Sequence, residues 1–197
     1  MLNELLKRYP QLTACRDSLI LAKETVIRCY EKKGKLLLCG NGGSCADCDH
    51  IVGELMKGFL LKRKIDDDRI PEDIRQYLQY SLPAISLSSQ TAAMSAFIND
   101  MEPSMVYAQM LYGYAQPNDI FIGLSTSGNS LNVVKAATVA KAIGLGTVAL
   151  TGKNGGSLSE TCDIAVRVPE TETYKIQELH LPVYHYLCAE IEKHFFD

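Results

Sequence analysis

His50 and Glu54 are four residues apart, in a stretch whose apolar spacing predicts a helix. Residues at this spacing share a helix face, so the imidazole and the carboxylate are expected to lie about one turn apart. Such a pair can shuttle protons or bind a divalent metal ion, and an exposed polar pair without a function is the simpler alternative. His180 and His185 fall in a second helical segment near the C-terminus. These two segments are therefore the candidate source of acid–base or metal chemistry.

Two loops rich in glycine or hydroxyl groups are the candidate binding elements. The glycine loop is CGNGGS at residues 39–44, and the hydroxyl loop is LSTSGNS at residues 124–130. Glycine lets backbone N–H groups approach an anion, and hydroxyls donate to phosphate oxygens. A tight turn and a helix-capping loop are the alternatives. One cap, however, accounts for only one of the four hydroxyls, which belong to Ser125, Thr126, Ser127 and Ser130.

Both loops directly follow predicted strands. Ligands of an open parallel sheet bind beyond the carboxyl ends of its strands, so the two loops are expected at one edge. Neither loop contains the lysine of a GxxxxGK[ST] motif or the spacing of GxGxxG, which disfavours nucleotide triphosphates and dinucleotides. The loops therefore predict a phosphorylated small molecule as ligand and no nucleotide cofactor.

The elements that must position these residues alternate along the chain. Five aliphatic runs predict strands at residues 35–39, 83–87, 119–124, 146–150 and 163–168. Most are apolar throughout, which is typical of strands covered by helices on both faces. Helical periodicity covers residues 12–30, 44–59, 103–114, 131–143 and a terminal segment in which Pro182 predicts a kink. The order predicts an α/β fold with a doubly wound, five-stranded parallel sheet flanked by helices, including N- and C-terminal helices.

Composition narrows the class of protein. The length of 197 residues and the 47% hydrophobic content favour a single domain over residues 1–197. The net charge of −3 provides no general attraction to nucleic acid. No apolar run is long enough to span a bilayer or to act as a secretion signal, so we expect a cytoplasmic protein with no membrane partner. The seven dispersed cysteines agree with reduced thiols.

Two features fall outside this pattern. Cys45 and Cys48 form a CxxC motif, but a redox pair or thiolate metal site is disfavoured because no second cysteine pair accompanies it. Residues 60–81 join a basic and an acidic cluster before a short helix that begins at Pro71. A solvated excursion is favoured for this segment over a lid or a partner surface.

Several motifs occur in a characteristic order: CGNGGS, DH, GE, ND, STSGNS, TGKNGG, and IQELH followed by a further histidine. Over residues 35–192 the sequence resembles the phosphoheptose (sedoheptulose 7-phosphate) isomerases of the sugar isomerase (SIS) domain family. The resemblance implies a single SIS-type, flavodoxin-like domain. It also implies aldose–ketose isomerisation of sedoheptulose 7-phosphate to D-glycero-D-manno-heptose 7-phosphate by enediol proton transfer. The implied assembly is a homotetramer with its sites at subunit interfaces.

The same resemblance implies roles for residues at matching positions. Substrate contacts fall on Asn41, Gly42, Gly43, Ser44, Glu54, Asn99, Asp100, Ser125, Thr126, Ser127, Ser130 and Gln177. The metal or proton-transfer set falls on His50, Glu54, Gln177 and His185, and zinc is the implied cofactor. We assign Glu54 as the carbon base and His185 as the acid that acts on the sugar oxygens. His180 matches a position that binds no ligand and is interpreted as structural.

The sequence also departs from the family pattern. Cys45 and Cys48 are not part of it, residues 60–81 are longer than the usual connection, and Tyr174 stands where an acidic residue is frequent. These departures bear on the identity of the sugar more than on the chemistry.

The rival function is a non-catalytic SIS-domain phosphosugar sensor or regulatory adaptor, resembling the replication initiator-associating proteins. Those proteins lack an acid at the position of Glu54, so its presence favours the enzyme. Other sugar-phosphate isomerases of the superfamily are disfavoured because their first loop differs from GNGGS.

Gln177 and His185 pose a geometric problem. They are eight residues apart, so on an unbroken helix their Cα atoms lie roughly 12 Å apart along the axis. Either Pro182 distorts the helix and brings them together, or they come from different subunits that meet at one site. We expect the second arrangement, and therefore a homotetramer with composite sites.

Overall fold

The computed structural model describes residues 1–197 and contains one sheet of five parallel strands in the order β2-β1-β3-β4-β5. The strands are β1 (Leu36–Cys39), β2 (Ala84–Ser86), β3 (Ile120–Leu124), β4 (Gly146–Thr151) and β5 (Ile164–Arg167). Each coincides with a predicted aliphatic run to within one residue at either end. The predicted doubly wound parallel sheet is confirmed.

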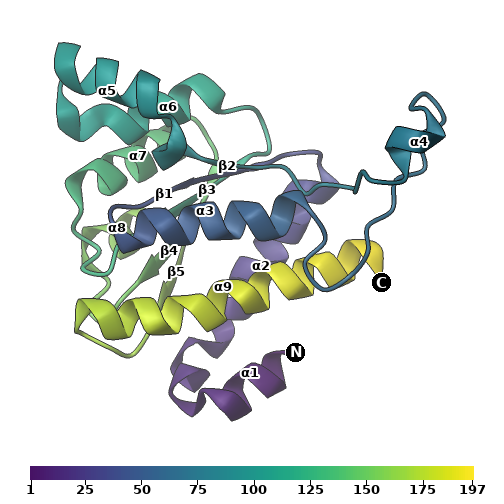
Figure 1. The fold of residues 1–197 in the computed structure, drawn as a ribbon. Coiled ribbons are helices and arrows are strands. Elements are labelled where there is room, and N and C mark those ends of the chain that lie inside the picture. Colours follow the sequence, from purple (N-terminus) through teal and green to yellow (C-terminus); the bar gives the residue numbers. More distant parts are fainter.

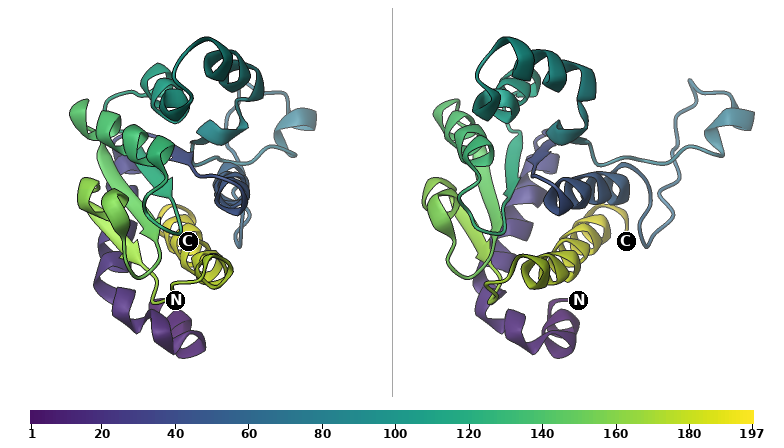
Figure 2. Two further views of the ribbon diagram at one scale, coloured as in Figure 1. Left: turned by 90° about the vertical axis from the view of Figure 1, so that its left-hand side faces the viewer. Right: turned by 60° about the vertical axis from the view of Figure 1, so that its left-hand side comes forward.

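Helices form a layer on each side of the sheet (Figure 1). One side carries α1 (Leu2–Arg8), α2 (Arg16–Glu31), α3 (Gly43–Met56) and α9 (Thr173–Phe196). The other carries α5 (Thr91–Asp100), α6 (Val106–Tyr114), α7 (Leu131–Ala142) and α8 (Gly156–Thr161). Figure 2 shows the sheet between these layers, with the short helix α4 (Glu72–Arg75) away from both. None of the helices combines the length and apolar character that a transmembrane helix requires.

Side chains of each strand alternate between two hydrophobic cores, as the pleat of a strand requires. Leu36 and Leu38 of β1 belong to the core that also contains residues of α2, α3 and α9. Leu37 and Cys39 belong to the core beneath α6, α7 and α8. Burial on both faces explains why the strands are apolar nearly throughout.

Several elements differ from the expectations drawn from sequence, among them α8, which was not expected, and residues 103–114, which divide into a 3₁₀ helix, Pro103–Met105, and α6. The helix expected over residues 12–30 is divided into a 3₁₀ helix, Pro10–Cys15, and α2. None of the residues of α5 is buried. The sequence of this helix therefore has no clear apolar stripe from which it could be predicted. Helix α9 continues through Pro182 without interruption, and Pro182 itself is buried.

Residues 60–81 extend away from the body of the molecule (Figure 1). Their base is held by an ion pair between Arg63 and Glu192 of α9, with Nε and Oε1 2.8 Å apart and both side chains fully buried. Arg63 also donates to the backbone carbonyl oxygens of Glu54 and Leu55, in the last turn of α3. The ion pair therefore ties the end of α3 to α9.

We expect His180 to make the protein less stable in mild acid. The side chain is completely buried, and neither ring nitrogen has a hydrogen-bond partner. Burial lowers its pKa from 6.5 to about 4, so the unfolded chain binds the proton first as the pH falls. Stability is fully present above pH 6.5 and is lost as the pH falls toward about 4. The full shift corresponds to about 3 kcal/mol.

Urea unfolding of the parent and of His180→Leu, at neutral pH and in mild acid, measures this effect. The variant should lose less free energy of unfolding than the parent on acidification, whereas His194→Gln, at an exposed position, should behave as the parent does. An equal loss in the parent and in His180→Leu would contradict the assignment to His180.

Candidate active site

Helices α3 and α9 lie side by side and run in the same direction (Figure 1). Near their N-terminal ends Gln177 lies against Gly43, where an added Cβ would come within 2.5 Å of Gln177 Nε2. Further along both helices, His50 of α3 meets His185 of α9. Because Gly43 has no side chain, the Gln177 amide can lie directly against the backbone at the start of α3.

His50, Glu54 and His185 form one group, which we call the acid–base cluster. His50 Nε2 lies 3.2 Å from Glu54 Oε1 and 3.4 Å from His185 Nε2. Lys57 Nζ lies 3.2 Å from Glu54 Oε2, so the carboxylate has a partner at each oxygen. The His50 side chain is 41% exposed and that of Glu54 is 16% exposed, which leaves the cluster accessible to a ligand.

His185 is held in an environment that favours its neutral form. Partial burial lowers its pKa, the neighbouring His50 lowers it further, and the Glu54 carboxylate opposes both effects. A neutral imidazole carries a donor on one nitrogen and an acceptor on the other. His185 can therefore both give and take a proton.

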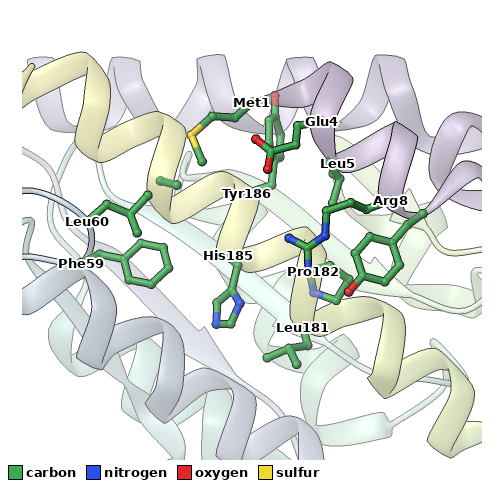
Figure 3. A pocket seen from close by; sticks show the side chains of 12 residues that line it. Met1, Glu4, Leu5, Arg8, Phe59, Leu60, Leu181, Pro182, His185 and Tyr186 are labelled. Atoms are coloured by element: carbon green, nitrogen blue, oxygen red, sulfur yellow. The ribbon is translucent and has the colours of Figure 1, made fainter.

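A cavity of about 330 Å³ lies beside His185 (Figure 3). It lies between α1 and α9, and its mostly apolar wall includes Phe59, Leu60 and Pro182, with Arg8 at one side. The rings of Phe59 and His185 are 5.5 Å apart between centroids. Apolar surface thus covers one side of the imidazole and lowers the stability of its charged form.

Two residues behind the cluster, Asp47 and Tyr184, were not candidates from the sequence. The Tyr184 hydroxyl lies 3.0 Å from His50 Nδ1 and 3.2 Å from Asp47 Oδ1. Burial raises the pKa of Asp47, and the hydrogen bond from Tyr184 opposes that rise. Asp47 stands three residues before His50, a spacing that places both on one helix face and could have signalled it. Tyr184 is brought there only by the contact between α9 and α3.

The glycine loop lies at the N-terminus of α3, where Asn41 is held by residues from two other elements. Asn41 and Asn132 exchange two side-chain hydrogen bonds, each 3.0 Å long, and the Tyr107 hydroxyl lies 3.0 Å from Asn41 Oδ1. Gly42 has a φ of 56°, in the left-handed region that favours glycine, and Ser44 is buried. The Asn41 amide thereby has a fixed orientation at the edge of the sheet.

The hydroxyl loop is adjacent, because β1 and β3 are neighbouring strands. Ser125 Oγ lies 2.9 Å from Ser130 Oγ. Gly128 has a φ of 68°, and an added Cβ would come within 1.8 Å of the Gly155 carbonyl oxygen. Only glycine fits at this point, so the loop is closely packed on the loop that follows β4. Two further hydroxyl side chains of the loop are partly or fully exposed, those of Thr126 and Ser127.

Asn99 and Asp100 lie apart from these groups, at the C-terminal end of α5. Both are exposed, and Asn99 Nδ2 donates to Asp100 Oδ1 at 2.8 Å. Helix α5 belongs to the layer opposite α3 and α9. A single chain therefore does not place these two residues beside the acid–base cluster.

The remaining predicted residues form two groups separated along α3. The glycine loop, the hydroxyl loop and Gln177 lie at its N-terminal end, whereas His50 and Glu54 lie about 10 and 16 Å further along the axis. Because α9 is continuous, Gln177 and His185 are also roughly 12 Å apart along its axis. Of the predicted set of four, one chain joins His50, Glu54 and His185, and it leaves Gln177 with the loops.

The acid–base cluster suits a divalent metal in its chemistry. No group of three or more His, Cys, Asp or Glu side chains has the complete arrangement of a metal site. The two donor separations at His50 Nε2, 3.2 and 3.4 Å, nevertheless match the edge of about 3.3 Å between ligands of a tetrahedral zinc ion. Two imidazoles and one carboxylate are also a zinc donor set. The donor types and these two separations suit zinc, but one chain does not bring three such side chains together into a metal site.

Comparison with known proteins agrees with this geometry. The SIS domain model matches residues 74–152. Phosphoheptose isomerase from a Nitratiruptor species is 41% identical over 169 residues, which cover 86% of this chain and 82% of that protein. The Helicobacter pylori (strain P12) phosphoheptose isomerase is 38% identical over 98% of this chain and 91% of its own length.

Solved structures lead to the same conclusion. A phosphoheptose isomerase from Francisella tularensis superposes with a TM-score of 0.78 at 28% identity, covering 97% of this chain and 94% of that one. The phosphoheptose isomerase of Neisseria gonorrhoeae gives a TM-score of 0.76 at 27% identity, covering 97% and 98%. The chain therefore belongs to the phosphoheptose isomerase family of SIS-domain proteins.

Proposed function

We propose that this protein interconverts sedoheptulose 7-phosphate and D-glycero-D-manno-heptose 7-phosphate. The observation that carries the proposal is the acid–base cluster, in which Glu54 and His185 both lie beside His50 at an accessible surface. An aldose–ketose isomerase needs a carbon base next to a group that moves protons between oxygens. Membership of the phosphoheptose isomerase family supports the identity of the sugar, and the acid–base cluster supports the proton-transfer chemistry.

The proton transfers can be assigned to named groups. Glu54 removes the proton from C1 of the ketose, and the electron pair forms the C1–C2 double bond of an enediol. His185 donates a proton to O2 and takes the proton from O1, so that the C1 hydroxyl becomes the aldehyde carbonyl. The Glu54 carboxyl then returns its proton to C2. All protons are returned, so no oxidant or reductant is needed.

Zinc is the proposed cofactor, held by His50, Glu54 and His185 and completed by Gln177 from a second copy. When bound, it would polarise the sugar carbonyl as a Lewis acid. A side chain that binds a metal has its lone pair engaged, so the ligand and proton-transfer roles of Glu54 and His185 compete. Assays with and without a chelator separate the two roles.

The hydroxyl loop is the proposed phosphate site, together with the glycine loop. Ser125, Thr126, Ser127 and Ser130 offer hydroxyl donors, and the N-terminus of α3 adds backbone N–H groups with a favourable dipole. Asn41, Gly42, Gly43, Ser44 and Gln177 line the same edge and would contact the sugar. Asn99 and Asp100 are proposed to contact substrate from a different copy.

The separation of Gln177 from the acid–base cluster supports sites shared between copies of the chain, and the family resemblance implies that the assembly is a homotetramer. If Gln177 completes the cluster, it must come from another copy, because α9 keeps it roughly 12 Å along the axis from His185. Residues 1–197 are proposed to act as one SIS domain in each copy. A phosphorylated sugar substrate and seven free cysteines favour the cytoplasm.

The non-catalytic sensor or adaptor is not favoured. Such a protein would need the phosphate-binding edge but not a carbon base. Here Glu54 is positioned by His50 and Lys57 at both carboxylate oxygens. This arrangement has no evident purpose in a protein that only binds the sugar.

Replacing the base tests the chemistry directly. Glu54→Gln should reduce kcat for sedoheptulose 7-phosphate by ~10²-fold or more, because the amide cannot accept the carbon proton. Binding of the substrate should remain, as measured by calorimetry. Glu24→Gln, at an exposed position on α2, is the matched control and should retain parental activity. Normal turnover by Glu54→Gln would remove Glu54 from the mechanism.

Replacing hydroxyls of the second loop tests the phosphate site. Ser125→Ala and Thr126→Ala should each weaken sedoheptulose 7-phosphate binding by about 1–3 kcal/mol, the usual contribution of a hydrogen bond to a charged group. Thr138→Ala, on the exposed side of α7, is the control. Calorimetry with unphosphorylated sedoheptulose completes the comparison. Equal affinity of the parent for both sugars would mean that the loop does not bind phosphate.

Mixed oligomers test the composite site. Co-expressed Glu54→Gln and Gln177→Ala chains should recover part of the activity that each variant lacks alone, because some sites then combine an intact cluster with an intact Gln177. Glu54→Gln with His185→Ala is the matched control and should recover none, since one chain carries both cluster residues. A monomer in sedimentation that retains full activity would contradict the composite arrangement.

A further inference from the structure

The Asn41 carboxamide lies at the centre of a hydrogen-bond network that joins the glycine loop to α6 and α7. Its Oδ1 lies 3.0 Å from the Tyr107 hydroxyl and 3.0 Å from Asn132 Nδ2. Its Nδ2 lies 3.0 Å from Asn132 Oδ1. Tyr107 is 5% exposed, whereas Asn41 is exposed. Two residues of different helices therefore hold one accessible side chain of the glycine loop.

A backbone N–H group determines which way round the two amides lie. Asn132 Oδ1 lies 3.0 Å from the backbone nitrogen of Val133, a donor that it shares with the Ser130 carbonyl oxygen. A backbone N–H can only donate, so the atom of Asn132 at this position must be the oxygen. Asn132 Nδ2 then faces Asn41 and needs an oxygen there. The paired amides therefore have one favourable orientation, with Asn41 Oδ1 next to Asn132 Nδ2.

The Tyr107 hydroxyl is the second donor to Asn41 Oδ1. Burial raises the pKa of Tyr107 to about 12, so the hydroxyl keeps its proton at neutral pH. Two acceptors lie within its reach, the Gly40 carbonyl oxygen at 2.8 Å and Asn41 Oδ1 at 3.0 Å. The Gly40 carbonyl has another donor, the Ser88 hydroxyl at 3.1 Å. If Tyr107 donated to Gly40, its oxygen and Asn41 Oδ1 would face each other with no hydrogen between them, so we assign its proton to Asn41.

The remaining hydrogen-bonding capacity of Asn41 is that of a donor. A carboxamide oxygen accepts two hydrogen bonds, and the nitrogen donates two. Tyr107 and Asn132 use both acceptor positions of Asn41, and Asn132 uses one of its two N–H groups. The second N–H belongs to an exposed residue and is available to an oxygen atom of a ligand.

We propose that Tyr107 and Asn132 are positioning residues that hold the Asn41 carboxamide so that its free N–H donates to an oxygen of the bound sugar. Tyr107 is buried and acts through Asn41 rather than by touching the sugar. Without these two partners the amide could rotate and present its oxygen to the ligand instead. The identity of the ligand rests on the proposed function, whereas the orientation of the amide does not.

Neutron diffraction from a crystal of the deuterated protein without sugar tests the orientation. The Asn41 atom next to Tyr107 should carry no deuterium, and the Tyr107 deuterium should lie between these two side chains. A reversed amide, with the Asn41 nitrogen next to Tyr107, would overturn the proposal. A Tyr107 deuterium directed at Gly40 would remove Tyr107 from the positioning role.

Calorimetry with sedoheptulose 7-phosphate tests the positioning role. All variants carry Glu54→Gln, so that the bound sugar is not converted. Asn41→Ala should weaken binding about 10-fold, and Tyr107→Phe or Asn132→Ala about 3- to 10-fold, the usual range for the loss of one hydrogen bond. Adding Tyr107→Phe to Asn41→Ala should cause no further loss, because residues that act through one side chain are not additive. Additive losses would mean that Tyr107 acts on the fold in general, which contradicts the positioning role.

Asn41→Asp tests whether Asn41 donates or accepts. This variant keeps acceptor oxygens but loses the N–H, so it should bind the sugar phosphate no better than Asn41→Ala does. Tighter binding by Asn41→Asp would show that Asn41 accepts from the ligand and would refute the proposal. Inorganic phosphate should bind equally well with Asn41 and with Ala at this position. A loss for phosphate as large as that for the sugar phosphate would place the contact on the phosphate group and overturn its assignment to the sugar.

Tyr114→Phe is the matched control. Tyr114 lies on α6 as Tyr107 does, but its hydroxyl bonds to Gln90 Oε1 at 2.9 Å rather than to the glycine loop. Its variant should bind the sugar phosphate with parental affinity. Thermal unfolding confirms that each variant is folded, and the neutron structure of the parent tests the orientation if one variant is not. The expected orientation in a parent that does not bind sedoheptulose 7-phosphate would overturn the proposed function and leave the orientation supported.

Discussion

The parallel contact between α3 and α9 is the constraint on which the rest of the site depends. Each helix follows a strand of the same parallel sheet on the same face, so both run in one direction. Near their N-terminal ends the Gln177 side chain lies against Gly43, and further along the helices His50 faces His185. A small shift of one helix along the other would separate the imidazoles of His50 and His185. Glu54 would then have only His50 beside it.

The opposite end of this contact is held by the buried ion pair of Arg63 and Glu192. Arg63 bonds the last-turn carbonyls of α3, while Glu192 of α9 accepts the backbone N–H groups of Phe59, Leu60 and Leu61. Burying two charges is costly, and the many hydrogen bonds here offset that cost. The backbone N–H donors and Arg63 overcome the effect of burial and lower the pKa of Glu192, which keeps the pair ionised. The helix that carries Glu54 is thus fixed at both ends against α9.

The groups proposed for binding and for chemistry lie at different positions along α3. The loops proposed to bind phosphate lie where β1 and β3 meet, because the chain winds in opposite directions from these two strands and leaves the edge between their loops open. The acid–base cluster lies two to three turns along α3 from that edge. A ligand that needs Gln177 next to the cluster must therefore meet two copies of the chain.

The sequence by itself determined the five strands, the two polar loops and the His50–Glu54 pair, because each depends on periodicity or spacing within one short segment. Helix α5 and the division of residues 10–31 into two helices could not be predicted from the sequence, because their boundaries depend on packing rather than on local pattern. Only the tertiary structure brought His185 to His50, set Gln177 apart from them, and placed Tyr184 between Asp47 and His50. Those relations join residues more than a hundred positions apart, and the register of one helix against another is decided by close packing across the whole core.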